Sequence, residues 1–371
     1  MPELYIGLMS GTSMDGIDAA LVEIDSGHIR LLNTHQHPIH HDLKNQLQKL
    51  ALNEPGTDLD MLGTCDTELG IVFADACIQL LKQSSIKPSA IKAIGSHGQT
   101  IRHQPDIQHP FSMQIGDASQ IAYRTGITTI NDFRRKDIAA GGQGAPLAPA
   151  FHQAFFSSPD HNRVILNIGG IANISYLPKD TNQHCTGFDC GPGNTLMDAW
   201  IQKKQQKEYD RNGTWAASND IHQGLLEKLM QDDFIHRPPP KSSGREHYNL
   251  GWLNRQLRSF SPIDDGQVQA TLCAFTAHSI YYAIQHFLTS VDEIIVCGGG
   301  AHNRHLMHLL DGLSGETALR KTDDTGIAAD WVEAAAFAWL AHQTLHQLPG
   351  NLPDITGASQ AVILGAIHPA G

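Results

Sequence analysis

Short apolar segments alternate with amphipathic stretches along the first part of the chain. Residues 4–8 are apolar and residues 17–24 alternate between apolar and polar, and a glycine-containing turn joins them, which predicts a β-hairpin with a functional tip. Residues 62–82 carry apolar side chains at helical spacing, and residues 91–95 are typical of a buried strand. Strands and helices that alternate in this way predict an α/β fold.

The second part of the chain repeats this plan. A strand–glycine turn–strand unit recurs around Gly169-Gly170. The other predicted elements are helices at 267–288 and 331–345 and a strand at 293–297. We therefore predict two related α/β domains with a cleft between them.

The predicted domain boundaries follow from these repeats. Residues 1–132 form the N-terminal domain, to which the C-terminal segment 354–371 returns, and residues 133–353 form the C-terminal domain. The segment 237–245 contains three consecutive prolines, which remove backbone donors, so we predict a loop there. A mobile loop is one interpretation of it.

Composition excludes several classes of protein. With 41% hydrophobic and 17% charged residues, a chain of 371 residues can bury an ordinary core. The net charge of -12 argues against a surface for nucleic acid, where basic stripes do the binding. No segment has the roughly 18 apolar residues of a membrane helix, and the N-terminus lacks the features of a signal peptide. Six cysteines without a C-x-x-C pair favour a reduced, cytoplasmic protein.

The turn of the first hairpin is the first candidate site. Its glycines let the backbone approach a ligand, its hydroxyls are donors, and its carboxylates can hold Mg²⁺ directly or through water. Phosphoryl transfer needs a phosphate cradle together with a metal. The alternative is an ordinary hairpin turn rich in Gly, Ser and Asp. The residues are Gly11, Thr12, Ser13, Met14, Asp15, Gly16, Ile17 and Asp18, with Asp15 and Asp18 the candidate metal ligands.

Two later glycine turns extend this hypothesis to a nucleotide. Gly169-Gly170 repeats the first hairpin, so the two turns are suited to hold a triphosphate, although Gly-Gly is also a common tight turn. Gly298, Gly299 and Gly300 follow a strand, where adenine or ribose can lie against bare backbone, and Asn303 comes soon after. Taken alone, three glycines are only a flexible turn.

Asp189 is the candidate catalytic residue. It lies between glycines and a proline, and an Asp held rigidly in a cleft is a good general base. The alternative is an N-terminal cap for a helix at 195–209, although Asn194 is better placed to cap it. Arg134 also has two interpretations. It could pair with a substrate carboxylate, or it could belong to a solvated charged turn. His35, His37, His40 and His41 have no Cys or carboxylate at matching spacing, which argues against a metal site there.

These motifs together resemble one family. They are similar to the anhydro-N-acetylmuramic acid kinases, in the superfamily of actin, sugar kinases and heat-shock chaperones. The resemblance covers essentially the whole chain and rests on GLMSGTSMDGID, SHGQT, NDFRRKDIAAGGQGAPLAP, NIGGIANIS, GFDCGPGN and GGGAHN. It implies two α/β domains of the actin-like ATPase (ribonuclease H-like) type with a nucleotide and sugar cleft between them.

The resemblance also implies an activity and roles for residues. Such an enzyme opens 1,6-anhydro-N-acetylmuramic acid with water and phosphorylates the freed hydroxyl from ATP with Mg²⁺, giving N-acetylmuramic acid 6-phosphate and ADP during cell-wall recycling. Asp189 would activate the water, and the glycine turns with Asn303 would bind ATP. The residues implied for the sugar are His97, Gln99, Thr100, Asp132, Arg134 and Glu333.

Two other functions stay open at this point. One is a kinase for an anhydrosugar without the lactyl group, such as levoglucosan. Arg134 would distinguish the two substrates if its side chain faces the carboxylate of the lactyl group. The other is a nucleotide-gated chaperone or actin-like protein, which would hydrolyse ATP without sugar. The expected partners are small molecules, with no nucleic acid and no membrane, and a homodimer is left open.

Overall fold

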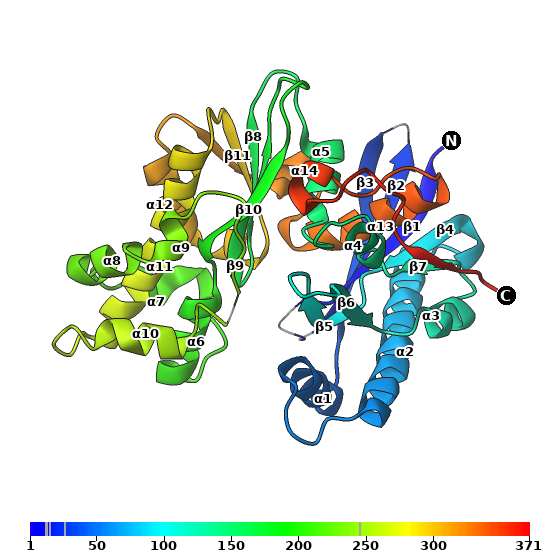
Figure 1. Cartoon of the computed structure of the whole chain (residues 1–371), viewed down its shortest axis with the longest axis horizontal. Coiled ribbons are helices and arrows are strands. Elements are labelled where there is room, and N and C mark those ends of the chain that lie inside the picture. Colours follow the sequence, from blue (N-terminus) through cyan, green and yellow to red (C-terminus); the bar gives the residue numbers. More distant parts are fainter. Residues whose placement is uncertain (12–13, 15, 26, 245) are drawn as a thin grey trace. The chain divides into compact units, whose positions relative to one another are not determined.

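The computed structural model describes residues 1–11, 14, 16–25, 27–244 and 246–371. Its contacts divide the chain into two units (Figure 1): unit 1 is Met1–Phe155 with Trp331–Gly371, and unit 2 is Phe156–Asp330. These divisions differ from the predicted ones after residues 132 and 353. One reason is that Phe337, which was predicted for the C-terminal domain, packs in unit 1 against His97, with ring centroids 4.7 Å apart.

Unit 1 is built on a six-stranded sheet. The strand order is β13-β7-β4-β1-β2-β3, and a separate two-stranded sheet pairs β5 with β6. The predicted first hairpin is confirmed, because β1 and β2 pair antiparallel, and β4 lies parallel to β1 on its other side. The strands are β1 (Glu3–Met9), β2 (Gly16–Asp25), β3 (His28–Pro38), β4 (Ile91–Ser96), β5 (Gln99–Gln104), β6 (Phe111–Ile115), β7 (Thr129–Asn131) and β13 (Ala366–His368).

Helix α13 packs directly on this sheet. The central strands allow this because they carry glycines: a Cβ on Gly7 would collide with the Ala334 carbonyl oxygen, and one on Gly95 with the Phe337 carbonyl oxygen. The helix begins one residue later than predicted. The helical segments of unit 1 are α1 (His41–Leu52), α2 (Leu59–Ser84), η1 (Pro88–Ala90), α3 (Ala118–Thr125), α4 (Arg135–Ala139), α5 (Ala148–Phe156), α13 (Val332–Leu345) and α14 (Pro353–Thr356).

Unit 2 repeats the topology of unit 1. Its five-stranded sheet has the order β10-β9-β8-β11-β12, with β8 and β9 antiparallel and β11 parallel to β8. Read from β3 to β7, the sheet of unit 1 has the same order and directions. The predicted class of two related α/β domains of actin-like type is therefore confirmed. The strands are β8 (Arg163–Ile168), β9 (Ile171–Leu177), β10 (Thr186–Pro192), β11 (Glu293–Cys297) and β12 (Ala318–Lys321).

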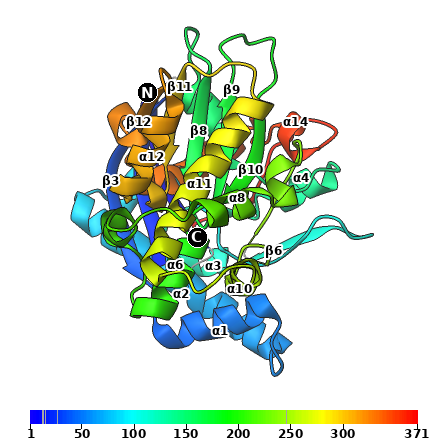
Figure 2. The ribbon, with the colours of Figure 1, turned by 90° about the vertical axis from the view of Figure 1, so that its left-hand side faces the viewer.

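The long helix α11 crosses the face of this second sheet (Figure 2), and most of its residues from Val268 to Ser279 are buried. Helix α6 ends at Gln205 rather than at residue 209. The helical segments of unit 2 are α6 (Thr195–Gln205), η2 (Arg211–Gly213), α7 (Thr214–Ala217), α8 (Gln223–Met230), α9 (Asp233–His236), α10 (Leu250–Leu257), α11 (Asp265–Phe287), η3 (Gly299–His302), α12 (Arg304–Ser314), η4 (Thr322–Thr325) and η5 (Ala329–Trp331).

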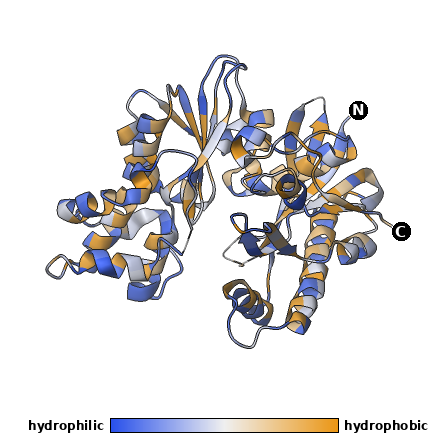
Figure 3. Cartoon of the chain, viewed as in Figure 1, coloured by the Kyte–Doolittle hydropathy of each residue, from blue (hydrophilic) through white to orange (hydrophobic). Residues whose placement is uncertain are grey.

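Helices on both sheets carry a mixture of apolar and polar positions. In α2, for example, hydrophobic and hydrophilic residues alternate along the helix (Figure 3), and its buried residues include Leu69, Phe73 and Leu80. Among the described residues, no helix is long and apolar enough to cross a membrane. All six cysteines are buried.

Candidate active site

The tip of the first hairpin is hydrogen-bonded to the SHGQT motif, which runs from the end of β4 to the start of β5. The buried Ser10 Oγ donates to Gln99 Oε1 at 2.7 Å, so Gln99 supports the hairpin tip. The backbone N–H of Met14 donates to the Gly11 carbonyl oxygen at 3.1 Å, and Met14 takes a left-handed φ of 56°. Ile17 is a core residue. Thr12, Ser13 and Asp15 lie outside the described residues.

Arg134 and His97 form the polar centre of unit 1. The guanidinium donates to His97 Nε2 through Nη2 at 2.8 Å and through Nε at 3.3 Å, and Nη1 donates to the Gly144 carbonyl oxygen at 2.9 Å. Since His97 Nε2 accepts these bonds, the ring is neutral with its proton on Nδ1. Burial and the Arg134 charge hold the pKa of His97 well below its usual value. Burial lowers the pKa of Arg134 to about 10, so it stays cationic at neutral pH.

A fully buried carboxylate holds the segment that carries Arg134. Asp137 accepts hydrogen bonds from the Gly144 N–H, Asn351 Nδ2 and Thr356 Oγ1, each at 2.7 Å. The bond to Gly144 orients the residue whose carbonyl oxygen accepts from Arg134. Asp137 therefore positions Arg134 indirectly, because it holds the backbone of residues 137–144 and links this segment to Asn351 and Thr356 near the C-terminus.

Glu333 and Asp18 complete the charged part of unit 1. Glu333 lies at the start of α13 with part of its side chain exposed to solvent. Desolvation by the surrounding protein raises the pKa of its carboxyl, and the Asp18 carboxylate raises it further. The charge of Arg134 opposes this rise. Asp18 also accepts from Gln36 Nε2 at 3.2 Å. The structure thus brings together Asp18 of the first hairpin and three of the residues predicted for the sugar, namely His97, Arg134 and Glu333.

Of the other two residues predicted for the sugar, Asp132 directly follows β7 and Thr100 lies near the start of β5. Asp132 has a φ of 56° and pairs with Arg135 Nη1 at 3.5 Å, and burial raises the pKa of its carboxyl while Arg135 opposes the rise. Thr100 Oγ1 accepts from Gln114 Nε2 at 3.1 Å. His103 is a further residue near the site, because the charge of Arg134 lowers its pKa in addition to burial.

In unit 2 the Gly169-Gly170 turn packs on the start of helix α6. The N–H of Gly193 donates to the Gly170 carbonyl oxygen at 2.9 Å, and the N–H of Asn194 donates to that of Gly169 at 2.8 Å. The predicted capping role of Asn194 is wrong in its chemistry. Asn194 stands at the N-cap position but makes no side-chain cap, because its Nδ2 donates to the Ile168 carbonyl oxygen at 3.2 Å.

The late glycine turn lies against the same segment. Gly298 has a left-handed φ of 79°, and a Cβ on Gly300 would collide with the Ile168 side chain. The structure therefore brings Gly298–Gly300 next to the Gly169-Gly170 turn. Asn303 caps helix α12 by accepting from the Leu306 N–H at 3.0 Å, so this side chain also has a structural role.

A hollow of about 400 Å³ contains none of the predicted site residues. It lies on unit 2, beside the Asp210–Gly213 segment whose glycine approaches Asn303. Its lining residues are Ile201, Lys207, Glu208, Tyr209, Asp210, Arg211, Thr214 and Trp215. We assign no role to it, because only its proximity to Asn303 connects it with the nucleotide motifs.

Asp189 lies on strand β10, at a bulge in the pairing with β9, rather than in a loop before the helix. Its Oδ2 accepts from Ser242 Oγ at 3.0 Å and from the Ser243 N–H at 2.8 Å. Among the described residues both bonds go to Oδ2, which leaves Oδ1 to take a proton. Burial raises the pKa of Asp189, and the bonds from Ser243 and Ser242 and the Lys241 charge oppose the rise. A half-buried carboxylate of raised pKa is suited to general-base chemistry.

Comparison with known proteins covers the whole chain. A family model described as "Anhydro-N-acetylmuramic acid kinase" matches residues 3–370. Relatives with that name are 48% identical over 370 residues in Coxiella burnetii (strain Dugway 5J108-111), covering 99% of this chain and 97% of theirs, and 51% identical over 376 residues in Photobacterium profundum, covering 99% of both. The chain belongs to the anhydro-N-acetylmuramic acid kinase family. The predicted resemblance is confirmed.

Solved structures resemble the chain much less than its family does. A ROK family glucokinase from Streptomyces griseus, in complex with glucose and AMPPNP, is 14% identical with a TM-score of 0.39 and covers 92% of this chain and 99% of its own. A similarity this low indicates nothing about the candidate site of the chain described here.

Some residues of the site were not predicted from the sequence. Ser242 and Ser243 hold Asp189 although they come from the proline-rich segment that suggested only a loop. Lys241 stands behind them, with Nζ 3.0 Å from the carbonyl oxygens of Phe234 and Ile235. Asp137 was visible within the charged motif of the family, but its partners Asn351 and Thr356 lie more than 200 residues away.

Proposed function

We propose that this protein catalyses the ATP-dependent hydrolytic phosphorylation of 1,6-anhydro-N-acetylmuramic acid to N-acetylmuramic acid 6-phosphate, with release of ADP. Membership of the family over residues 3–370 is the observation that carries this proposal. The environment of Asp189 supports it on chemical grounds. We place the reaction in the cytoplasm, where ATP is available, as a step in recycling cell-wall sugars.

Asp189 is the proposed general base. Its Oδ1 takes a proton from water, the water oxygen bonds to the anomeric carbon, and the bond from that carbon to the bridging oxygen breaks. The freed oxygen bonds to the γ-phosphorus of ATP, and the bond to the leaving ADP breaks. Attack opposite the departing oxygen needs no covalent intermediate, as in inverting glycoside hydrolysis. Ser242 and Ser243 keep Oδ2 occupied and thereby orient Oδ1.

Sugar recognition is assigned to His97, Gln99, Thr100, Asp132, Arg134 and Glu333. Arg134 is the proposed partner of the lactyl carboxylate. Its Nε, Nη1 and Nη2 each already donate one bond within unit 1, so two of its five N–H groups have no assigned acceptor among the described residues. His97 and Gly144 would hold the guanidinium rigidly while those two groups contact the carboxylate.

ATP is assigned to the glycine turns. The proposed phosphate-binding residues are the Gly11–Asp18 hairpin and Gly169-Gly170, and Gly298–Gly300 with Asn303 would take the adenosine. Asp18 fits a divalent cation, because its carboxylate lies close enough to Glu333 to raise the pKa of that group. Asp15 is the second proposed ligand. A bound Mg²⁺ would neutralise charge on the transferring phosphate.

Product mass in isotopic water tests this proposal. The protein, ATP and Mg²⁺ are incubated with the anhydrosugar in ¹⁸O-water, and ADP and sugar phosphate are quantified. We expect one ¹⁸O in the sugar product at the anomeric position and none in the transferred phosphate. Phosphorylation of open-ring sugars alone, or ATP hydrolysis independent of sugar, would refute it. 1,6-Anhydro-N-acetylglucosamine and levoglucosan, which lack the lactyl group, are the controls for Arg134.

A further inference from the structure

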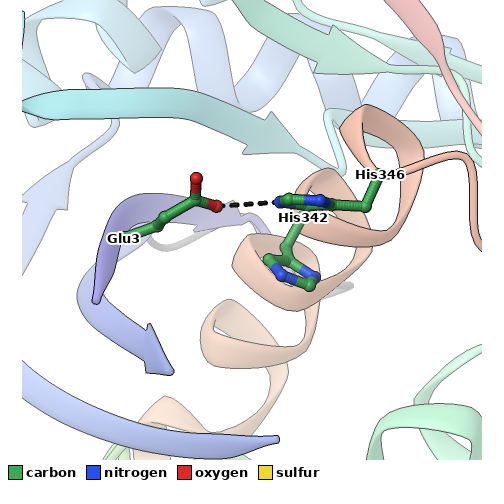
Figure 4. A group of neighbouring side chains, drawn as sticks. All are labelled: Glu3, His342 and His346. Atoms are coloured by element: carbon green, nitrogen blue, oxygen red, sulfur yellow. Dashed lines mark hydrogen bonds and ion pairs between the residues drawn. The ribbon is translucent and has the colours of Figure 1, made fainter. Parts of the chain in front are cut away.

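Three side chains with metal-binding atoms meet at the end of unit 1 where β1 begins and α13 ends (Figure 4). His342 lies in the last turn of α13, His346 is the C-cap residue four positions later, and Glu3 reaches them from β1. One ligand atom from each of the three lies within 4.8 Å of the others. Helical histidines at i and i+4 point to the same face, which is the spacing of many metal-binding helices.

The contacts of these residues suit a metal site. His346 Nε2 lies 2.8 Å from Glu3 Oε2, and the two imidazole rings have centroids 4.3 Å apart. His342 Nδ1 lies 3.1 Å from Gln343 Oε1, which can accept only if Nδ1 carries the proton. That tautomer leaves Nε2 of His342 as the lone-pair nitrogen, an arrangement typical of histidines that bind metals.

A second layer of contacts orients the carboxylate. Tyr5 Oη donates to Glu3 Oε2 at 2.7 Å, and Lys92 Nζ lies 3.7 Å from Glu3 Oε1. Side-chain exposures of 45% for His346 and 24% for Glu3 leave the group open to entry of an ion from solvent. None of these residues belongs to the proposed reaction.

We propose that Glu3, His342 and His346 bind one divalent transition-metal ion of the Zn²⁺ class. Two imidazoles and one carboxylate are a common ligand set for such ions, with water completing the coordination. Tetrahedral zinc with ligands at about 2.0–2.2 Å separates them from one another by about 3.5 Å. In the structure the Glu3 and His346 ligand atoms are 2.8 Å apart and all three ligand atoms lie within 4.8 Å of one another, so small side-chain rotations complete the site.

The ion would join the first strand of unit 1 to the last turn of α13. Both elements extend to the candidate active site, since β1 leads to Gly11 and α13 begins beside Glu333. An ion that binds only the folded protein stabilises it by mass action. The bound metal would thus raise the unfolding temperature of the protein and would not enter the chemistry at Asp189.

Calorimetric titration of the full chain with ZnCl₂ alone, without nucleotide, tests this site. We expect wild type to bind one ion at least tenfold more tightly than His342→Gln and His346→Gln. We also expect Co²⁺ to give the visible absorption of a four-coordinate site in wild type and not in these two variants. The matched control is the double variant His35→Gln with His37→Gln, which removes two neighbouring histidines of β3 whose ring nitrogens lie 3.3 Å apart.

The double variant of His35 and His37 must bind zinc as tightly as wild type. Equal zinc affinity in wild type and His346→Gln, or loss of the ion in the β3 double variant, overturns the proposal. Circular dichroism of each variant confirms that it is folded before titration. Glu3→Gln provides a third arm that keeps the shape of the side chain and removes its charge, and we expect it to weaken zinc and the Co²⁺ spectrum as well.

Discussion

Arg134 donates to His97 Nε2 at 2.8 Å, so the imidazole serves as an acceptor for a cation in the centre of unit 1. A protonated His97 would place an N–H and a positive charge against the guanidinium. The ring is only 5% exposed, so solvent relieves little of that repulsion. This arrangement keeps Arg134 oriented and makes the folded protein resist protonation of His97.

The first prediction concerns stability in acid. The low pKa of folded His97 means that below about pH 6.5 the unfolded chain binds a proton there that the folded protein does not, so the free energy of unfolding falls with pH. The loss from one such group is at most about 1.4 kcal/mol per pH unit. In His97→Gln the contribution of residue 97 to this pH dependence is absent. The free energy of unfolding measured by urea denaturation should therefore fall less between pH 7 and pH 5 than in wild type.

The exposed His109 is the control for this measurement. His109→Gln should keep the wild-type dependence on pH. If His97→Gln loses stability in acid as steeply as wild type, His97 is protonated in the folded protein and its acceptor role is wrong.

Local patterns explain why much of the fold was predictable. The strands around Gly169-Gly170 are short apolar segments on either side of a tight turn, and both the turn and the strands depend on neighbouring residues. The helix at α11 similarly follows from periodicity within one segment. The repeated strand order then follows because the same local plan occurs twice.

Contacts distant in sequence could not be predicted in this way. Arg134 and His97 are 37 residues apart, and Asp137 meets Asn351 from 214 residues away. The predicted domain boundaries differ from the observed units for the same reason, because nothing local to Phe337 indicates that it packs on His97. Asp189 was identified from its glycine-rich surroundings, but its strand position and its partners depend on how residues 237–244 fold back.

The second prediction concerns Asp137. Asp137→Ala leaves three donors without their acceptor, at Gly144, Asn351 and Thr356, and should lower the free energy of unfolding by about 3 kcal/mol or more. Because Gly144 also holds Arg134, we expect the KM for the sugar to rise more than kcat falls. Urea denaturation and steady-state kinetics measure the two effects.

Thr356→Val is the matched control, since it removes one of these donors and keeps the carboxylate. It should cost about 1 kcal/mol and leave the KM nearly unchanged. Equal effects of the two variants on the KM would show that Asp137 does not position Arg134.

The third prediction concerns the close packing of α13 on β1. Gly7→Ala places a methyl group against the Ala334 backbone and should destabilise the protein by about 3 kcal/mol, as overpacking does. Gly63→Ala is the control, because Gly63 is an exposed residue inside α2 with nothing near its Cβ position, and it should stabilise by up to about 1 kcal/mol. Thermal unfolding of both variants checks the opposite signs; a neutral Gly7→Ala would contradict the contact.

The fourth prediction concerns Asp189. Asp189→Asn should lower turnover by about 10²–10⁴-fold while leaving ATP binding unchanged. Because burial raises the pKa of Asp189, the stability linked to its proton is present at low pH and is lost as the pH rises through the folded pKa. A neutral Asn avoids that loss, so the variant should be no less stable than wild type at pH 7. Steady-state kinetics, nucleotide titration and thermal unfolding measure the turnover, the ATP binding and the stability of the variant. If Asp189→Asn keeps more than a tenth of wild-type turnover, Asp189 is not the base.

The fifth prediction separates the two serines that hold Asp189. Ser242 donates through its hydroxyl, whereas Ser243 donates through its backbone N–H, which every residue but proline retains. Both bonds favour the ionised carboxylate, so removing one raises the pKa of Asp189 further. Since the base must be ionised, the acid limb of kcat/KM should move to higher pH in Ser242→Ala and stay in place in Ser243→Ala. An equal shift in both variants would mean that the loop as a whole, rather than the Ser242 hydroxyl, sets the ionisation of the base.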